Sequence, residues 1–378
     1  MILASPRGGP PIQVTVYGAG AIGGYTGAAL ARAGHEVLLV DLAEAHVAEL
    51  KESGLTIETP EGRWTARVHA ITPQELGGQH DLVLLAVKSQ HTADALKTLV
   101  PHLAPRGIIV SLQNGLNEEL IARQIGAWRT LGCLVNWGAD WLAPGRVRYG
   151  GPGAFVLGEL DGAIGPRVKE LGRLLAPVAE LRLSDNVRGY KWAKHVYGAL
   201  LFATALVDAH VYEVVERSRP VQRMLVALVA EGMALAAAAR ARLEAFDEYD
   251  PELYRAAHGG DTAALDAAMA AVAHHYRTRT KTKTGIWRDL AVRKRKTEAD
   301  GLFRVALEKA AQLRVPMPLT RRMIELIHDL EEGRRPMAWE NLDELVALSS
   351  GTPRSHADGP RRPPPLSGST AGGTQAGT

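Results

Sequence analysis

The feature that most constrains the fold is a glycine-rich turn near the start of the chain. It follows an apolar, β-branched segment at residues 12–17 and precedes a helix expected from Tyr25 to Arg32. In this context three glycines allow a tight turn, close approach to a pyrophosphate and close helix–strand packing. Free amides and the helix dipole there stabilise an anion, which predicts a bound dinucleotide; a tight turn without a ligand is the alternative. The motif is Gly18-Ala19-Gly20-Ala21-Ile22-Gly23.

An acidic residue at the end of the next predicted strand bears on the choice of coenzyme. Asp41 follows Gly18 by 23 residues, close to the spacing of about 20 at which a carboxylate binds the adenosine ribose. A carboxylate there repels a 2′-phosphate, and the next basic residue is Lys51. The cofactor is therefore expected to be NAD or NADP, with NAD favoured. Capping of a helix expected at residues 43–50 is the alternative role for Asp41.

Apolar and helical segments alternate through the first half of the chain. Further buried strands are predicted at residues 36–40, 81–87 and 107–112. Strands separated by helices at this spacing form a parallel sheet with helices on both faces. The sequence therefore predicts a doubly wound α/β Rossmann domain over residues 12–183.

The pattern changes after this domain. Residues 184–348 are rich in Ala, Leu, Arg and Glu and contain no convincing strand, which predicts an all-α second domain. Within it we expect a long Ala-rich helix at 221–243 and a loop-containing insertion at 244–280. The chain ends are expected to lack a packed structure, as a flexible arm at 1–11 and a disordered tail at 349–378.

Charge and cysteine content exclude several classes of protein. The formal net charge is only +3, and a single cysteine, Cys133, excludes an intramolecular disulfide. We expect Cys133 to be a small buried residue in a core strand. No apolar run reaches the roughly 18 residues of a membrane span, and no signal-peptide region is visible, so we expect a cytoplasmic protein without membrane contact. The histidines lack the spacing of a metal site, so no metal is expected.

One strongly basic segment needs an explanation. Residues 277–296 hold nine Lys or Arg side chains and one acid, Asp289. Three interpretations remain open: a solvated helix face, a wall that attracts an anionic substrate, and a nucleic-acid surface. Only Tyr276 and Trp287 lie close enough for base stacking, so no nucleic-acid partner is expected.

Four further motifs occur in a fixed order along the chain. Together with the glycine turn they resemble the ketopantoate reductase (2-dehydropantoate 2-reductase) family over roughly residues 12–330. The resemblance implies a Rossmann domain, a helical domain like that of 6-phosphogluconate dehydrogenase and a cleft between them. It also implies a cytoplasmic homodimer with a role in pantothenate biosynthesis. The motifs are Ala86-Val87-Lys88, Gln113-Asn114-Gly115, Lys191-Trp192-Ala193-Lys194 and Lys296-Thr297-Glu298-Ala299-Asp300.

The resemblance assigns roles to individual residues. Lys194 matches the general acid, and Glu298 matches the acid that hydrogen-bonds the substrate. Lys88 and Asn114 match residues that line both the coenzyme and the approach of the substrate, and Thr284 approximates a substrate-binding serine. An ammonium at the carbonyl oxygen stabilises the charge that hydride attack creates and delivers a proton.

Each of these assignments has a simpler alternative. Lys191 lies one helical turn from Lys194 and could be confused with it, although its place before Trp192 fits the motif less well. Glu298 could be an ordinary ion-pair partner in a basic segment, and Asn114 could be only a turn residue.

The chain departs from the family pattern where the substrate is expected. The family carries asparagines four and eight residues after the catalytic lysine, and here these positions are Gly198 and Phe202. The Asn-Gly expected after the Thr-Glu motif is replaced by Phe303-Arg304, and Leu42 replaces the arginine that serves NADP in many members. These changes predict a substrate with a more apolar side chain than ketopantoate.

The sequence as a whole predicts an NAD(P)-dependent oxidoreductase that reduces a small 2-oxo acid to a 2-hydroxy acid. Two alternatives remain open: an opine-type or β-hydroxy-acid dehydrogenase, and a dinucleotide-binding sensor that has lost catalysis.

Overall fold

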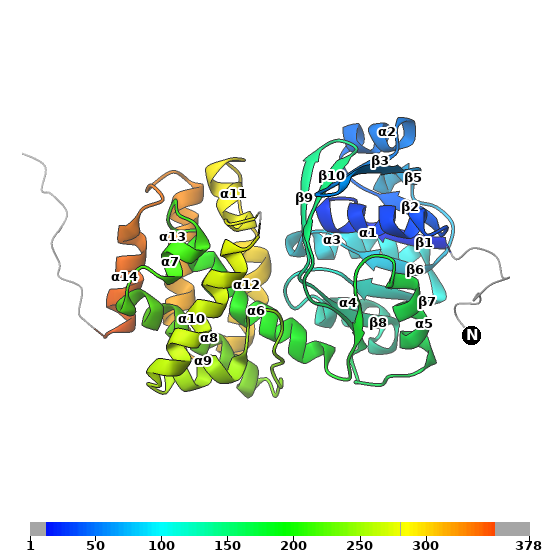
Figure 1. Cartoon of the computed structure of the whole chain (residues 1–378). Coiled ribbons are helices and arrows are strands. Elements are labelled where there is room, and N and C mark those ends of the chain that lie inside the picture. The colour runs from blue at the N-terminus through cyan, green and yellow to red at the C-terminus, as the bar shows by residue number, and fades with distance from the viewer. Residues whose placement is uncertain (1–12, 280, 352–378) are drawn as a thin grey trace, which may run out of the picture.

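A computed structural model of the chain describes residues 13–279 and 281–351. It has an N-terminal α/β domain and a C-terminal helical domain (Figure 1), as expected from the sequence. The predicted arm at 1–11 and most of the predicted tail at 349–378 lie outside the described residues.

The N-terminal domain is built on an eight-stranded sheet in the order β12-β11-β8-β7-β6-β1-β2-β5. Its paired strands run parallel except for β8 and β11, which confirms the doubly wound prediction. In chain order the strands are β1 (Gln13–Tyr17), β2 (Glu36–Val40), β5 (His69–Ile71), β6 (His80–Leu85), β7 (Leu103–Ser111), β8 (Thr130–Val135), β11 (Phe155–Glu159) and β12 (Arg182–Leu183).

Helices and one-turn 3-10 segments connect these strands. The helix after the glycine turn begins at Ala21, four residues earlier than expected, because Gly20 already serves as its N-cap. The helices are α1 (Ala21–Arg32), α2 (Glu44–Glu52), α3 (Thr92–Leu99), α4 (Glu118–Ile125) and α5 (Pro166–Leu175). The 3-10 segments are Pro73–Glu75, Ser89–His91, Val100–His102 and Ala127–Arg129.

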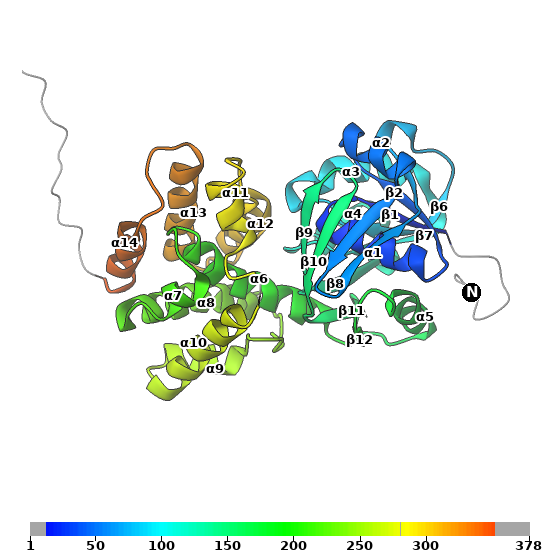
Figure 2. The same cartoon turned by 45° about the horizontal axis from the view of Figure 1, so that its top comes forward.

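A second, four-stranded sheet was not predicted. Its order is β4-β3-β10-β9, and it joins β3 (Leu55–Thr59) and β4 (Gly62–Ala66) to β9 (Gly138–Ala143) and β10 (Arg146–Gly151). Figures 1 and 2 both show β9 and β10 on the side of the N-terminal domain that faces the helical domain. This sheet therefore supplies residues to the interface between the domains.

The described part of the second domain is helical, as expected. Helix α6 leaves the last strand of the main sheet and enters the helical domain (Figure 2), where it packs against α8. The helices are α6 (Val187–Thr204), α7 (Val211–Val215), α8 (Arg219–Ala238), α9 (Pro251–His258), α10 (Thr262–Arg277), α11 (Gly285–Ala291), α12 (Ala299–Leu313), α13 (Pro318–Glu331) and α14 (Trp339–Ser349).

Two details of the helical domain differ from the sequence expectation. The long helix expected at 221–243 is α8, which ends at Ala238, and the expected insertion at 244–280 is mostly helical, as α9 and α10. Helix α8 is long and apolar enough to cross a membrane by length and composition alone. Half of its most apolar window is buried inside the domain, and packing against α6, α9 and α14 accounts for that composition.

The expectation for the single cysteine is confirmed. Cys133 lies in β8 and is completely buried in the core of the N-terminal domain. Burial raises the pKa of its thiol to about 12, so the thiol stays protonated and is a poor nucleophile.

Candidate active site

The glycine turn has the geometry that its sequence predicts. Gly18 has a φ of +100°, and a Cβ there would lie 2.7 Å from the amide nitrogen of Val87. A Cβ on Gly23 would lie 2.0 Å from the carbonyl oxygen of Gly18, so only glycine lets α1 pack this closely. A Cβ on Gly20 would meet nothing within 4 Å. The backbone is therefore open at the position where a pyrophosphate would approach, and the turn fits a dinucleotide.

Asp41 and a neighbouring histidine fix the shape of this turn. The Asp41 carboxylate accepts a hydrogen bond from the Ala19 amide at 2.8 Å and another from the Ala43 amide at 3.0 Å. It thus joins the glycine turn to Ala43, the N-cap residue of α2, and binding of the ribose by Asp41 stays a prediction. Buried His46 accepts from the Gly145 amide through Nδ1 at 2.9 Å, so its Nε2 donates to the Ala19 carbonyl at 2.9 Å.

Helix α6 brings two lysines to the N-terminal domain, and their surroundings differ. The Lys191 ammonium is buried, lies 2.9 Å from a Glu118 carboxylate oxygen and donates to the Gln113 carbonyl. The Lys194 ammonium donates to the Val135 carbonyl and forms no ion pair with any described residue. Burial and the charge of Lys191 lower the pKa of Lys194 to about 7. Lys194 can therefore exchange a proton near neutral pH.

Lys88 and Glu298 meet across the domain interface. The Lys88 ammonium lies 3.2 Å from an Asp289 carboxylate oxygen and 3.6 Å from a Glu298 carboxylate oxygen. Asp289 is buried and also pairs with Arg293 and Arg295. Burial alone would raise the pKa of Asp289, but Lys88 and the two arginines hold it below its usual value. Glu298 and Lys194 share no ion pair in the described ranges.

Asn114 and Thr284 differ in their surroundings. The Asn114 side chain is exposed, while its carbonyl accepts hydrogen bonds from Ser89 and Asn117, both at 2.6 Å. This fixes the loop beside Lys88 and leaves the Asn114 amide available. Thr284 is buried, and its hydroxyl accepts from the Trp287 amide at 3.1 Å to cap α11.

The basic segment at 277–296 lies partly on the domain interface. Lys281 and Arg288 pair with Asp140 of β9, and Arg293 and Arg295 pair with Asp289. Of the three interpretations, this placement favours a wall that attracts an anion. This group of ion pairs carries an excess of positive charge, because three acids (Asp140, Asp289 and Glu298) pair with five basic side chains (Lys88, Lys281, Arg288, Arg293 and Arg295).

Comparison with known proteins identifies the family. Residues 14–162 match the family model described as "Ketopantoate reductase PanE/ApbA", and residues 186–331 match the model for the C-terminal part of the same family. The chain belongs to the ketopantoate reductase family. Together the two matches cover both domains and most of the described residues.

The curated relatives of this family member are named 2-dehydropantoate 2-reductase. One from Pyrococcus abyssi is 31% identical over 200 residues, which are 50% of this chain and 62% of that protein. The chain thus spans less than two thirds of the length of that relative. One from Streptococcus pyogenes serotype M3 is 26% identical over 325 residues, which cover 84% of this chain and 97% of that protein.

Solved structures share the fold over both domains. A PanE/ApbA family ketopantoate reductase from Ralstonia eutropha JMP134 is 27% identical with a TM-score of 0.71, covering 85% of this chain and 99% of that one. A D-mandelate dehydrogenase with NADH and anilino(oxo)acetate is 22% identical with a TM-score of 0.74, at the same coverage of 85% and 99%. At that identity the second likeness concerns the fold alone.

Two of the positions that depart from the ketopantoate reductase pattern, Phe202 and Phe303, lie in the core of the helical domain. The Phe202 ring is buried and lies 5.0 Å from the Phe303 ring, which lies 5.2 Å from the imidazole of His195. Burial lowers the pKa of His195 to about 4, so this imidazole is neutral at physiological pH. A Cβ on Gly198 would meet nothing within 4 Å, so this position has room for a larger side chain or a ligand.

Several residues of the site were not found from the sequence. His46, Asp140 and Lys281 carry no local motif, and their contacts join segments far apart in the chain. In the sequence Asp289 stands out only as the single acid of a basic segment. That feature is the one local signal for its role, because in the structure three basic side chains pair with it.

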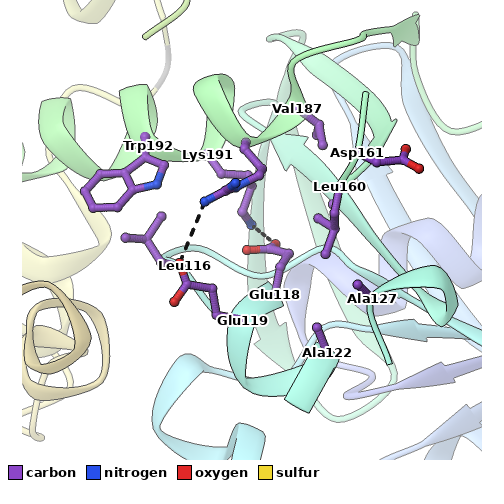
Figure 3. A pocket seen from close by; sticks show the side chains of 12 residues that line it. Leu116, Glu118, Glu119, Ala122, Ala127, Leu160, Asp161, Val187, Lys191 and Trp192 are labelled. Carbon is purple, nitrogen blue, oxygen red and sulfur yellow. Dashed lines mark ion pairs between the residues drawn. The ribbon is translucent and has the colours of Figure 1, made fainter. Parts of the chain in front are cut away.

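A separate cavity of about 350 Å³ lies between α4 and α6 (Figure 3). Lys191 and Glu118 point toward one another in its wall, beside the apolar side chains of Leu116 and Trp192. None of the site residues predicted from the sequence lines this cavity.

Proposed function

We propose that this chain is an NAD(P)-dependent reductase of a 2-oxo acid with an apolar side chain, with Lys194 as the proton donor. The observation that carries the proposal is the state of Lys194. It is a largely buried ammonium with a pKa of about 7 and no carboxylate partner among the described residues. A group of this kind can protonate an oxygen that becomes negative during reduction.

The glycine turn and Asp41 would hold the coenzyme. The amides at the start of α1 would face the pyrophosphate, and the Asp41 carboxylate stands where it can accept the ribose hydroxyls. Its negative charge and the absence of a basic residue at Leu42 favour NAD over NADP. A bound nicotinamide coenzyme supplies the hydride, and the protein supplies the proton and the charge that stabilise the product.

The remaining interface residues would orient the substrate. Lys88 and Glu298 lie beside the Asn114 loop, so the carboxylate of Glu298 can accept hydrogen bonds from a substrate hydroxyl while Lys88 holds it in place. Phe202 and Phe303 are buried apolar rings at positions where the family offers amides. This contrast supports an apolar 2-oxo acid over ketopantoate. A role in pantothenate biosynthesis would require turnover of ketopantoate itself.

The test is oxidation of NADH and of NADPH by the full chain with a panel of 2-oxo acids. The panel contains ketopantoate, pyruvate, 4-methyl-2-oxopentanoate and benzoylformate, the last because a structural neighbour is named D-mandelate dehydrogenase. We expect faster turnover with an apolar acid than with ketopantoate, and a loss of about 100- to 10,000-fold in Lys194→Ala. Lys97→Ala is the control, since this exposed lysine forms a surface ion pair with Asp94 on α3.

Three outcomes would contradict the proposal. Full turnover in Lys194→Ala would show that Lys194 is not the proton donor. Tight coenzyme binding without turnover of any acid would favour the dinucleotide-binding sensor, and turnover only when an amine is added would favour an opine-type dehydrogenase.

We further propose that the chain acts in the cytoplasm as a homodimer formed through the helical domain. The measurement is a mass in solution by light scattering, and a monomer mass at micromolar concentration would contradict the dimer.

A further inference from the structure

Lys281 is a mostly enclosed ammonium that the proposed chemistry has not used. It lies between α10 and α11, and its side chain is 28% exposed. Its one ion-pair partner among the described residues is Asp140 of β9, at 3.5 Å. An ammonium has three hydrogen-bond donors, so most of the donor capacity of Lys281 is open.

Arg288 explains why Asp140 does not neutralise Lys281. The Arg288 guanidinium donates to the same Asp140 oxygen that faces Lys281. One carboxylate is therefore shared by two cations, and the group keeps an excess positive charge in a partly enclosed place. An anion that reaches Lys281 would supply the missing charge.

The other paired cations of this group lie closer to a carboxylate. Lys88 faces two carboxylates, the nearer at 3.2 Å, and Arg293 and Arg295 pair with buried Asp289 at 3.0 and 2.9 Å. At 3.5 Å, Lys281 is farther from its nearest carboxylate than any of these cations.

The charge of Lys281 also acts on the proposed proton donor. Burial and Lys191 lower the pKa of Lys194 most, Asp247 and Glu248 raise it, and Lys281 adds a smaller lowering effect. In a 2-oxo acid the carboxylate is bonded directly to the carbonyl carbon, so a site for such an acid needs one cation at the carboxylate and a proton donor at the neighbouring oxygen.

We propose that Lys281 binds the carboxylate of the substrate, and that Arg288 and Asp140 position its ammonium. This inference rests on the proposed function, because it names the group that selects an acid over a neutral ketone. Lys281 is then a binding residue that determines specificity, and Asp140 of β9 and Arg288 of α11 hold its ammonium from the two sides of the domain interface.

The test uses a pair of ligands that differ only in the carboxylate. N-isobutyloxamate resembles an apolar 2-oxo acid but its amide carbonyl resists reduction, and N-isobutyloxamide is its neutral counterpart. Binding of each to the NADH-loaded full chain is measured by titration calorimetry. We expect the wild-type chain to bind the oxamate at least about tenfold more tightly, as a charge-assisted hydrogen bond would give.

Three variants make the test specific. Lys281→Met should lose the preference for the oxamate while its affinity for NADH stays unchanged, and Lys281→Arg should keep part of the preference. Arg277→Met is the matched control, because it also removes one positive charge but from an exposed side chain that pairs with Glu216. Thermal unfolding confirms that each variant is folded.

The outcomes separate this inference from the proposed function. An unchanged preference in Lys281→Met, or no preference in the wild-type chain, overturns the role of Lys281 even if 2-oxo acids are reduced. Lys281-dependent binding of the oxamate without turnover of any acid keeps the carboxylate site and overturns the reductase. If the chain reduces 2-oxo acids and Lys281 binds their carboxylate, Lys281→Met should raise KM about tenfold or more and leave kcat within a few-fold.

Discussion

At the scale of single residues, the proton on Lys194 sets the pH dependence of the proposed reaction. Burial, with the charge of Lys191, lowers the pKa of this lysine to about 7. Reduction needs the protonated form, so kcat should fall about tenfold for each pH unit above 7, while oxidation of the 2-hydroxy acid should rise and level off. The measurement is kcat in both directions at saturating coenzyme and substrate. Parallel profiles for the two directions would contradict this role of Lys194.

Gly198 gives a second prediction at this scale. A Cβ here meets nothing within 4 Å, so Gly198→Asn should fold and place an amide where the family carries one. We expect kcat/KM for ketopantoate to rise about tenfold relative to an apolar 2-oxo acid, because the amide can pair with the substrate hydroxyl. Gly198→Ala is the control, since alanine stabilises the helix at least as much as asparagine but adds no polar group. An equal rise with alanine would mean that helix stability, not the amide, is responsible.

At the scale of elements, substitution of Gly23 should reduce the stability of the protein, whereas substitution of Gly20 should reduce its affinity for coenzyme. Gly23→Ala forces a Cβ against the Gly18 carbonyl at 2.0 Å, so α1 must shift, and we expect a loss of about 1–3 kcal/mol in the free energy of unfolding. Gly20→Ala meets no protein atom within 4 Å, so it should keep its stability and lose affinity for coenzyme. Urea unfolding and NADH titration distinguish the two. Normal NADH affinity in Gly20→Ala would show that the pyrophosphate does not bind close to Gly20.

The contrast between the two sheets explains how much of the fold the sequence could predict. The strands of the main sheet are local apolar runs, and the glycine turn is a local motif, so both are visible without tertiary information. The second sheet pairs β3 with β10, about 90 residues later in the chain, and no local pattern records that pairing. For the same reason local motifs predict Lys88, Lys194 and Glu298 as site residues. The pairing of Lys281 with Asp140 is visible only in the structure, where β9 contacts the segment before α11.

At the scale of the whole molecule, charged side chains bridge the two domains. The main bridges are Lys88 with Asp289 and Glu298, Arg288 with Asp140, and Lys309 with Glu119. Each joins the N-terminal domain to the helical domain, so the position of Lys194 relative to the glycine turn depends on them. The buried carboxylate of Asp289 should contribute most to stability among these groups, because it pairs with three cations at once.

Asp289→Asn should therefore destabilise the whole molecule, by about 3–5 kcal/mol in the free energy of unfolding at neutral pH. The folded-state pKa of Asp289 lies below its usual value, since Lys88, Arg293 and Arg295 outweigh the effect of burial. Its contribution is complete above the unfolded pKa and disappears as the pH falls through the folded pKa, so the variant and the wild-type chain should converge in acid. Asp94→Asn, which breaks an exposed pair with Lys97, should change stability by less than about 1 kcal/mol. Urea unfolding over a range of pH measures both. A constant difference down to the lowest pH would show that Asp289 stabilises the interface through its shape and hydrogen bonds and not through its charge.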